Sequence, residues 1–216
     1  MNDDIRLQQS KKLLVENLIR KGIRDTKILD ALLKINREDF IEKGFFDRSY
    51  DDSALPIPDG QTISQPYTIC FMLELLEIKK GLKILEVGTG SGYLTAILVE
   101  LGFEVYSVER SEVLYNISRE RLNNLKIKCN LKLGDGTEGW KEFAPYDRVV
   151  ISAASPIFPE YLKDQLNESA IIVCPVGDKN TQTMNKGIFR NNKFEVINYD
   201  SFRFVPLVGK MGWDAG

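Results

Sequence analysis

The stretch from Lys83 to Leu94 most constrains how this chain folds, because an apolar strand pattern runs directly into a glycine-rich turn. A helix pattern begins at Tyr93 and continues to Leu101. Glycine tolerates the positive φ of a tight turn and lets the backbone approach a ligand closely. The start of the following helix offers unpaired N–H groups. This order predicts the first strand–turn–helix of a nucleotide-binding α/β domain.

The spacing of the glycines separates two classes of nucleotide-binding loop. A dinucleotide fingerprint, G-x-G-x-x-G, requires glycine where Tyr93 stands, and the third glycine here is Gly92. An acid, Glu86, precedes the first glycine. The resulting Glu-x-Gly-x-Gly-x-Gly loop resembles that of the S-adenosylmethionine-dependent methyltransferases. Their cofactor is cationic and lacks phosphate. A nearby carboxylate is therefore more compatible with this cofactor than with the anionic pyrophosphate of a dinucleotide.

Length and charge limit the classes of partner. A chain of 216 residues is long enough for one domain with a sizeable core. The formal net charge is −2 and no block of Lys and Arg stands out, so we expect neither nucleic acid nor an anionic membrane as partner. The acidic start, Met1–Asp4, lacks a signal-peptide core, and no apolar run approaches the ~20 residues of a membrane span. We therefore expect a cytoplasmic protein.

The chain contains no histidine. This excludes Ser-His-Asp and Cys-His catalysis and histidine-ligated zinc, and we expect no metal. Cys70, Cys129 and Cys174 are widely spaced and form no C-x-x-C pair, so they are interpreted as inert buried thiols of a reducing compartment.

Hydrophobic periodicity predicts an alternation of strands and helices after a helical start. Helices are expected over residues 4–21, 26–34 (capped by Asp25), 39–46, 66–80, 93–101, 111–123 and 159–166. Strands are expected over residues 83–87, 104–108, 128–133, 148–153, 170–175, 183–190 and 194–201, with a further short run over 202–208. Residues 51–63 and 134–144 are expected to be loops or turns.

These elements predict an α/β, Rossmann-like fold with a mostly parallel twisted sheet and helices on both faces. One domain is expected, with a helical N-terminal addition (1–58), a cofactor-binding core (59–176) and a C-terminal β region (177–216). Within that last region, Asn191-Asn192 predicts the turn of an antiparallel hairpin.

Two further motifs fall at strand ends, where open α/β sheets bind ligands. Glu109 ends the second core strand about 20 residues beyond the glycine loop, where an acid accepts ribose hydroxyls. Asp135-Gly136 follows the third core strand. There the carboxylate can accept from an adenine amino group while Gly136 leaves room for the ring.

Ser64 lies in the segment Gly60–Pro66, which the nucleotide-binding fold does not require. A serine just before a helix that starts at proline is a common helix cap. A helix N-terminus also favours an anion. The hydroxyl can therefore cap the helix, orient an anionic substrate, or do both.

Along nearly its whole length the chain resembles the protein-L-isoaspartate O-methyltransferase family. The matching segments are residues 52–57 (DSALPI), 60–66 (GQTISQP), 85–93 (LEVGTGSGY), 134–137 (GDGT), 144–147 (APYD) and 203–208 (RFVPLV). The resemblance implies a cytoplasmic repair enzyme. It would transfer a methyl group from S-adenosylmethionine to the α-carboxylate of L-isoaspartyl residues in damaged proteins and peptides, and the ester would then collapse to succinimide.

The resemblance also implies a set of site residues. The expected catalytic residue is Ser64. The expected cofactor contacts are Thr62, Ile63, Glu86, Gly88, Thr89, Gly90, Ser91, Glu109, Arg110, Asp135 and Gly136. The expected substrate contacts are Ile63, Ser64, Val205, Pro206 and Leu207. Tyr67 departs from the family, many of whose members have histidine there, and this departure bears on substrate preference. A carboxylate nucleophile is ionised at neutral pH and needs no general base, which agrees with the absence of histidine.

Three other functions stay open from the residues. An NAD-dependent oxidoreductase shares the strand–turn–helix and Glu109, but Tyr93 and Glu86 argue against it. A non-catalytic isoaspartyl- or cofactor-binding adaptor is disfavoured by intact Ser64, Glu109 and Asp135. Nothing in the sequence excludes a methyltransferase that acts on a small-molecule carboxylate.

Overall fold

The computed structural model describes residues 3–214. Met1 and Asn2 of the acidic start, and residues 215–216 at the end of the C-terminal region, lie outside the described part. Among residues 3–214, no helix combines the length and the apolar character that a membrane crossing requires.

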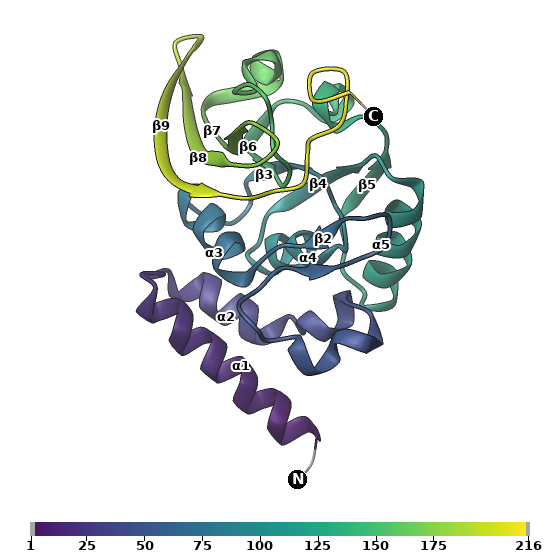
Figure 1. The fold of residues 1–216 in the computed structure, drawn as a ribbon. Helices are drawn as coiled ribbons and strands as arrows, with labels where there is room; N and C mark the ends of the chain where they lie inside the picture. The colour runs from purple at the N-terminus through teal and green to yellow at the C-terminus, as the bar shows by residue number, and fades with distance from the viewer. Residues whose placement is uncertain (1–2, 215–216) are drawn as a thin grey trace.

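A seven-stranded sheet forms the centre of the molecule (Figure 1). Its strands, in spatial order, are β5 (Asn130–Leu133), β4 (Glu104–Glu109), β3 (Lys83–Val87), β6 (Tyr146–Ile151), β7 (Leu166–Gly177), β8 (Gln182–Arg190) and β9 (Lys193–Phe202). The strands from β5 to β7 pair in parallel, and β8 and β9 add antiparallel. The predicted mostly parallel α/β sheet with a C-terminal hairpin is therefore confirmed.

The chain reverses its direction of travel across the sheet between β3 and β6. From β3 it moves outward through β4 to β5, and from β6 it moves the other way to β7. Neighbouring connections that leave in opposite directions open a crevice at the carboxyl ends of the two strands. This crevice lies where the glycine loop follows β3.

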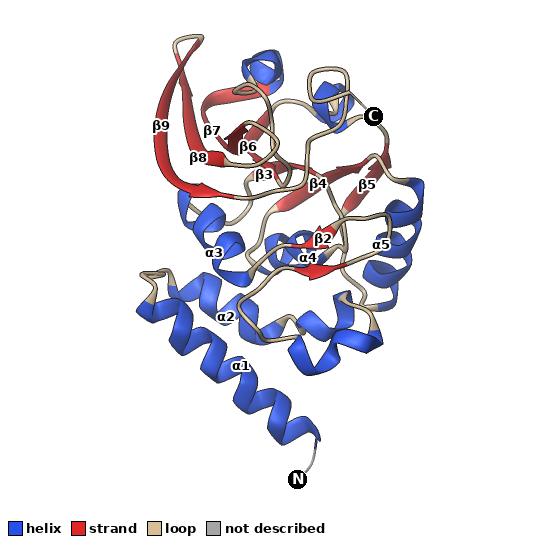
Figure 2. Cartoon of the chain, in the orientation of Figure 1, coloured by secondary structure: helices blue, strands red, loops and turns tan. Residues whose placement is uncertain are grey.

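Alternation along the strands gives the sheet two apolar faces. Ile84 and Val105 pack with the helices α3 (Pro66–Leu75), α4 (Tyr93–Glu100) and α5 (Glu112–Asn124). Leu85 packs on the opposite face. The elements that cover that face include two short 3₁₀ helices, η4 (Lys141–Phe143) and η5 (Glu160–Gln165), and the C-terminal segment, while a third, η3 (Gly136–Glu138), follows β5 (Figure 2).

The N-terminal helices α1 (Asp3–Arg20) and α2 (Thr26–Lys34) pack beyond α3 and α4 on the first face (Figure 1). Asp25 caps α2 as predicted, because its carboxylate accepts a hydrogen bond from the Lys27 amide at 2.8 Å. Apolar side chains of both helices, including Leu18 and Ile28, belong to the same cluster as the sheet face. The helical N-terminal region therefore shares a core with the α/β region.

Two of the predicted α-helices are wrong in type. The segment 39–46 forms two 3₁₀ helices, η1 (Arg37–Phe40) and η2 (Lys43–Arg48), because Ile41 takes extended backbone between them. The segment 159–166 forms the 3₁₀ helix η5, and β7 begins at once with Leu166. The 3₁₀ helix is typical of short connecting segments such as these.

Several predicted boundaries also shift. The strand predicted at 128–133 starts at Asn130, the strand predicted at 148–153 covers Tyr146–Ile151, and the strand predicted at 170–175 covers Leu166–Gly177. The helix that follows Pro66 ends at Leu75 rather than near residue 80. The predicted loop 51–63 contains a two-stranded ladder in which β1 (Leu55–Pro56) pairs with β2 (Thr62–Ile63).

The predicted hairpin turn at Asn191-Asn192 is confirmed. Arg190 pairs with Lys193, and both asparagines have positive φ, 51° and 60°. Asparagine tolerates this conformation, which a two-residue turn between twisted strands requires.

Replacing Leu18 with alanine should test whether α1 contributes to the common core. Leu18 is fully buried, whereas Leu13 on the same helix is 63% exposed. We expect Leu18→Ala to lower the free energy of unfolding by ~2–5 kcal/mol, and Leu13→Ala to change it by less than about 0.5 kcal/mol. Urea denaturation measures both. Equal and small effects would show that α1 is not part of the cooperative unit.

Candidate functional site

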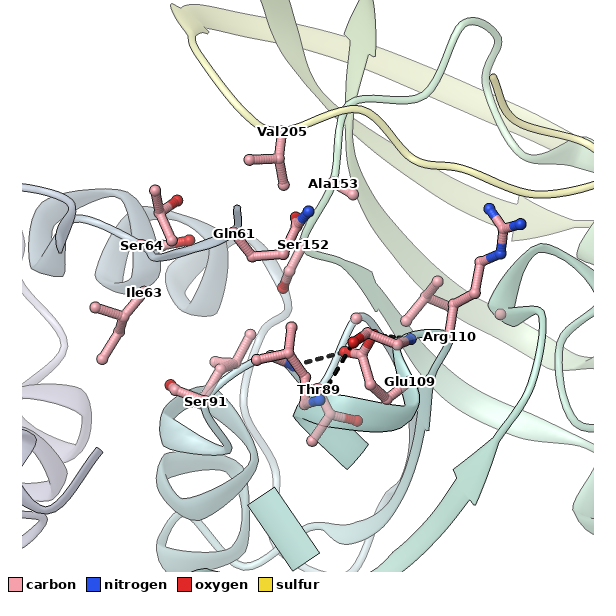
Figure 3. A pocket seen from close by; sticks show the side chains of 18 of the residues that line it. Gln61, Ile63, Ser64, Thr89, Ser91, Glu109, Arg110, Ser152, Ala153 and Val205 are labelled. Carbon is pink, nitrogen blue, oxygen red and sulfur yellow. Dashed lines mark hydrogen bonds between the residues drawn. The ribbon is translucent and has the colours of Figure 1, made fainter. Parts of the chain in front are cut away.

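A cleft of about 350 Å³ opens at the carboxyl ends of β3 and β6 (Figure 3). It has the size of a small-molecule site. The expected site residues that line it are Thr62, Ile63, Ser64, Gly88, Thr89, Gly90, Ser91, Glu109, Arg110, Gly136, Val205, Pro206 and Leu207. The structure thus brings these segments, which are widely separated in the sequence, to one place.

The loop after β3 places its backbone on the floor of the cleft. Its glycines take φ of 94°, 55° and 88° at positions 88, 90 and 92, a conformation that other residues adopt at a cost. Gly92 also lies against α5, since a Cβ there would be 3.3 Å from the Leu122 side chain. The loop therefore requires glycine for its conformation and for its close packing.

Glu109, at the end of β4, ties the loop to the neighbouring strand. Its carboxylate accepts hydrogen bonds from the amides of Gly90, at 2.8 Å, and Ser111, at 2.9 Å (Figure 3). Such charge-assisted bonds are stronger than neutral ones. Glu109 also lines the cleft, and its carboxylate keeps acceptor capacity beyond these two hydrogen bonds.

Gly136 forms another part of the floor at the end of β5. A Cβ at this position would approach Cγ1 of Val87 to 2.5 Å, so no larger residue fits without displacing β3. Contact with Val87 therefore favours glycine here, and the expectation that this position leaves room for an adenine ring stays a prediction.

Asp135 is not among the residues that line the cleft. Its carboxylate accepts hydrogen bonds from the amide and hydroxyl of Thr137 and from the amide of Lys210. Burial acts to raise the pKa of Asp135, but these hydrogen bonds outweigh it and hold the pKa below its usual value. In this arrangement Asp135 caps η3 and fixes the C-terminal segment.

Glu86 also does not line the cleft, because its side chain is wholly buried within the sheet. Oε2 accepts a hydrogen bond from the Thr95 hydroxyl at 2.6 Å, whereas Oε1 has no partner. Burial raises the pKa of Glu86 to about 7. The carboxyl group is thus bound to the first turn of α4 through Thr95. The side chain of Glu86 does not reach the cleft, so the expected direct contact with the cofactor has no support from its position.

Ser64 stands on the side of the cleft opposite Glu109 and Arg110 (Figure 3). The N-cap of α3 is Gln65, whose side chain accepts from no helix amide, and the Tyr67 amide in the first turn donates instead to the Asp52 carboxylate at 2.9 Å. The simple helix-cap interpretation of Ser64 is therefore wrong, because the hydroxyl is not bound to the helix amides. Ser64 reaches the cleft because β1 and β2 hold the preceding residues Thr62 and Ile63 in a ladder.

The segment Val205–Leu207 forms a further wall of the cleft. The Ala154 amide donates to the Val205 carbonyl and the Leu207 amide donates to the Ala154 carbonyl, both at 2.8 Å. The Trp213 indole donates to the same Ala154 carbonyl at 3.0 Å. These bonds hold the apolar wall beside the end of β6.

Sequence reasoning missed part of the cleft. The further lining residues are Asp59, Gln61, Ile69, Met72, Val87, Tyr93, Leu94, Ser111, Leu114, Ser152, Ala153 and Val208. Most of them flank recognised motifs. Ser152 belongs to no motif, but it directly follows β6 and its buried hydroxyl has no hydrogen-bond partner. The strand-end rule that found Glu109 applies equally to Ser152.

Residues 8–212 match the model of the protein-L-isoaspartate(D-aspartate) O-methyltransferase family. A protein-L-isoaspartate O-methyltransferase of Dictyoglomus thermophilum is 45% identical over 207 residues, which cover 95% of this chain and 94% of the relative. One from Christiangramia forsetii is 46% identical over 210 residues, which cover 96% and 98%.

Solved structures agree with these matches. One protein-L-isoaspartate O-methyltransferase superimposes with a TM-score of 0.86 at 27% identity, covering 94% of this chain and 67% of the other. A Plasmodium falciparum protein assigned to the same family, solved in complex with S-adenosyl-L-homocysteine, gives a TM-score of 0.78 at 28% identity and covers 91% and 97%.

Glu109→Ala should weaken binding of S-adenosylmethionine, because the change removes the acceptor that faces the cleft and releases the Gly90 amide. We expect a loss of ~1.5–3 kcal/mol, which is roughly tenfold to a hundredfold in Kd. Isothermal titration of the folded variant measures it. Glu112→Ala, which changes an exposed acid in the first turn of α5, serves as the control. An unchanged Kd in Glu109→Ala would remove this residue from the cofactor site.

Glu86 should make the stability of the protein depend on pH. Its folded pKa of about 7 lies above the unfolded value of ~4.3, so the neutral form is favoured in the native state. The contribution of Glu86 to stability is therefore fully present below about pH 4, is lost as the pH rises from there through about 7, and changes little above that. At alkaline pH the loss reaches ~2–4 kcal/mol.

Glu86→Gln should remove this decline. The measurement is the free energy of unfolding in urea between about pH 5 and about pH 8. Glu120→Gln, at an exposed position on α5, should keep the slope of the unaltered protein. A parallel pH dependence in the unaltered protein and Glu86→Gln would contradict the assignment of the titration to Glu86.

Proposed function

Because this chain belongs to the protein-L-isoaspartate(D-aspartate) O-methyltransferase family, we propose that its cleft methylates the α-carboxylate of L-isoaspartyl residues in damaged proteins and peptides. The cofactor is S-adenosylmethionine. The observation that supports this use of the cleft is the placement of Ser64 and the Val205–Leu207 wall across from the glycine loop and Glu109.

The residues present fit the cofactor. Among the described residues that line the cleft, Arg110 is the only basic one, whereas Glu109 and Asp59 are acidic. This balance suits a cationic ligand and offers little to a pyrophosphate. Glu109 would hold the ribose hydroxyls, the backbone of Gly88–Gly90 would lie against the remainder of the ligand, and the unpaired Ser152 hydroxyl supplies a further polar contact. When bound, the cofactor supplies an electrophilic methyl group.

The chain itself orients the carboxylate that accepts the methyl group. A carboxylate with a reference pKa near ~3.5–4 is ionised at neutral pH, so no residue needs to remove a proton. The Ser64 hydroxyl, which is free of the α3 amides, donates a hydrogen bond to one carboxylate oxygen. This bond directs the other oxygen toward the centre of the cleft, and correct placement of the nucleophile is the main source of rate.

The wall of Val205 and Leu207 covers the reacting groups. Both side chains line the cleft, and their backbone is fixed to Ala154. An apolar cover excludes water from the carboxylate and strengthens its interaction with the Ser64 hydroxyl. Ile63, directly before Ser64, adds a further apolar lining residue. Together, these apolar residues would enclose the isoaspartyl carboxylate within the cleft.

We also infer a setting for this activity. The enzyme acts in the cytoplasm, where reducing conditions keep cysteine free. Cys70, Cys129 and Cys174 are free cysteines, and burial raises the pKa of each thiol and makes it unreactive. The regions 1–58, 59–176 and 177–216 work as one domain, a proposal supported by the core that α1 and α2 share with the sheet. Isoaspartyl peptides and proteins are its partners.

The substrate class is tested by comparing two peptides that differ only at one residue, L-isoaspartate or normal aspartate. We expect release of S-adenosylhomocysteine with the isoaspartyl peptide and none above background with its aspartyl twin. A panel of small-molecule carboxylates completes the assay. Equal turnover of both peptides, or turnover of a small carboxylate alone, would overturn the proposed substrate.

Ser64→Ala should lower kcat on the isoaspartyl peptide well beyond any effect on stability. Loss of the orienting hydroxyl lets the nucleophile shift, and a displacement of ~1 Å costs roughly a hundredfold in rate. The Kd for S-adenosylmethionine should change much less. The assay uses saturating cofactor at a temperature below the melting transition of the variant.

Ser118→Ala is the matched control, because this buried serine lies in α5 and its hydroxyl donates to the Tyr115 carbonyl outside the cleft. Its kcat should stay at the level of the unaltered enzyme. Near-normal turnover of Ser64→Ala would end the catalytic assignment of Ser64.

A further inference from the structure

Arg37 is a fully buried arginine in the N-terminal region, outside the cleft. It opens the 3₁₀ helix η1. Its guanidinium donates four hydrogen bonds, and all four acceptors are backbone carbonyls. They belong to Ser49 at 2.9 Å, Asp51 at 3.3 Å, Ser53 at 2.9 Å and Ser64 at 3.1 Å. A buried cation that uses its donors on main-chain oxygens fixes the path of the chain around it.

Two of these bonds join separate parts of the chain at one nitrogen. Nη2 of Arg37 donates both to Ser53, in the loop before β1, and to Ser64, just before α3. The same two parts are joined by the Gln65 side chain, which donates to the Asp52 carbonyl at 3.0 Å. Ser64, which lines the cleft, is therefore held by a hydrogen bond to its backbone carbonyl from Arg37, outside the cleft.

The other end of η1 is anchored on the cofactor side of the cleft. Phe40, which is buried, packs its ring against Tyr93 with centroids 5.4 Å apart. Tyr93 is the first residue of α4, directly after the glycine loop, and it lines the cleft. One short helix therefore contacts the glycine-loop side through Phe40 and the Ser64 side through Arg37.

We propose that Arg37 is a positioning residue of the methyl transfer, which fixes Ser64 at a set distance from the glycine loop. This proposal rests on the role of Ser64 proposed above. Arg37 touches neither substrate nor cofactor, since it does not line the cleft. It acts through the Ser64 carbonyl, and η1 supplies the rigid base because Phe40 and Arg37 are both buried.

Lysine cannot replace this function. A guanidinium holds two donor-bearing Nη nitrogens in one plane, so it serves carbonyls on separate segments at fixed angles, whereas an ammonium is a single flexible point of charge. Arg37→Lys keeps the positive charge but does not reach all four carbonyls in that geometry. Ser64 is then expected to move relative to the glycine loop.

The test is a double-mutant cycle of Arg37→Lys and Ser64→Ala. We expect Arg37→Lys to lower kcat on an isoaspartyl peptide by about tenfold to a hundredfold. The KM for the peptide should change less, and the Kd for S-adenosylmethionine should stay as in the unaltered enzyme. In the Ser64→Ala background, Arg37→Lys should cause no further loss of kcat, because the positioned hydroxyl is already absent.

Arg148→Lys is the matched control. Arg148 is also buried, and its guanidinium also donates to backbone carbonyls, those of Leu76, Asp147 and Glu77. It lies near the start of β6, at the end of the strand away from the cleft. We expect Arg148→Lys to lose stability while keeping kcat, which separates a loss of packing from a loss of positioning.

The outcomes distinguish this proposal from the role of Ser64. Turnover of Ser64→Ala at the normal level overturns the proposed role of Ser64 and this proposal with it. An active-site role of Ser64 with additive losses in the cycle overturns the positioning by Arg37 alone. Equal kcat losses in Arg37→Lys and Arg148→Lys overturn it too. So does failure of Arg37→Lys to fold under conditions where Arg148→Lys is folded, since Arg37 would then support the whole fold.

Discussion

The parallel pairing of β3 with β6 is the constraint on which the rest of the structure depends. Val87 pairs with Ile151 at the carboxyl ends of the two strands, and the next amide, that of Ser152, donates to the Val87 carbonyl at 3.0 Å. Because the chain leaves β3 in one direction and β6 in the other, no connection covers this point. The floor of the cleft is consequently main chain on a rigid apolar base, and Gly136 approaches that base too closely for any side chain.

The parts of the site that the sequence predicted are those fixed by local rules. The glycine loop and Glu109 follow from strand ends and spacing, and both line the cleft. Glu86 and Asp135 stand beside these motifs, but adjacency along a strand does not fix the direction of a side chain. One carboxylate is buried beneath the loop and the other is bound by Thr137 and Lys210. Such contacts depend on which segments meet in three dimensions.

The N-terminal region shows the limit of periodicity most clearly. Its residues predicted a helical addition to the α/β core, and nothing in their periodicity singled out Arg37. Arg37 is instead buried because the loop from Ser49 to Ser53 presents carbonyls that no regular element satisfies. Unpaired buried carbonyls are costly. An irregular loop over a core therefore requires a side chain with several donors, and a single arginine meets that requirement.

The lack of histidine fits this arrangement. An ionised carboxylate arrives as a competent nucleophile, so the enzyme has no proton to remove, and the groups that face it need only be hydroxyls, amides and apolar walls. If the rate of methyl transfer depends on how the carboxylate is oriented rather than on proton transfer, it also depends on the residues that fix the orienting groups in position. In this chain those residues, Glu86 below the loop and Arg37 behind Ser64, are buried ionisable groups outside the cleft. Burying these two groups lowers the free energy of unfolding, and their hydrogen bonds hold the geometry of the cleft in return.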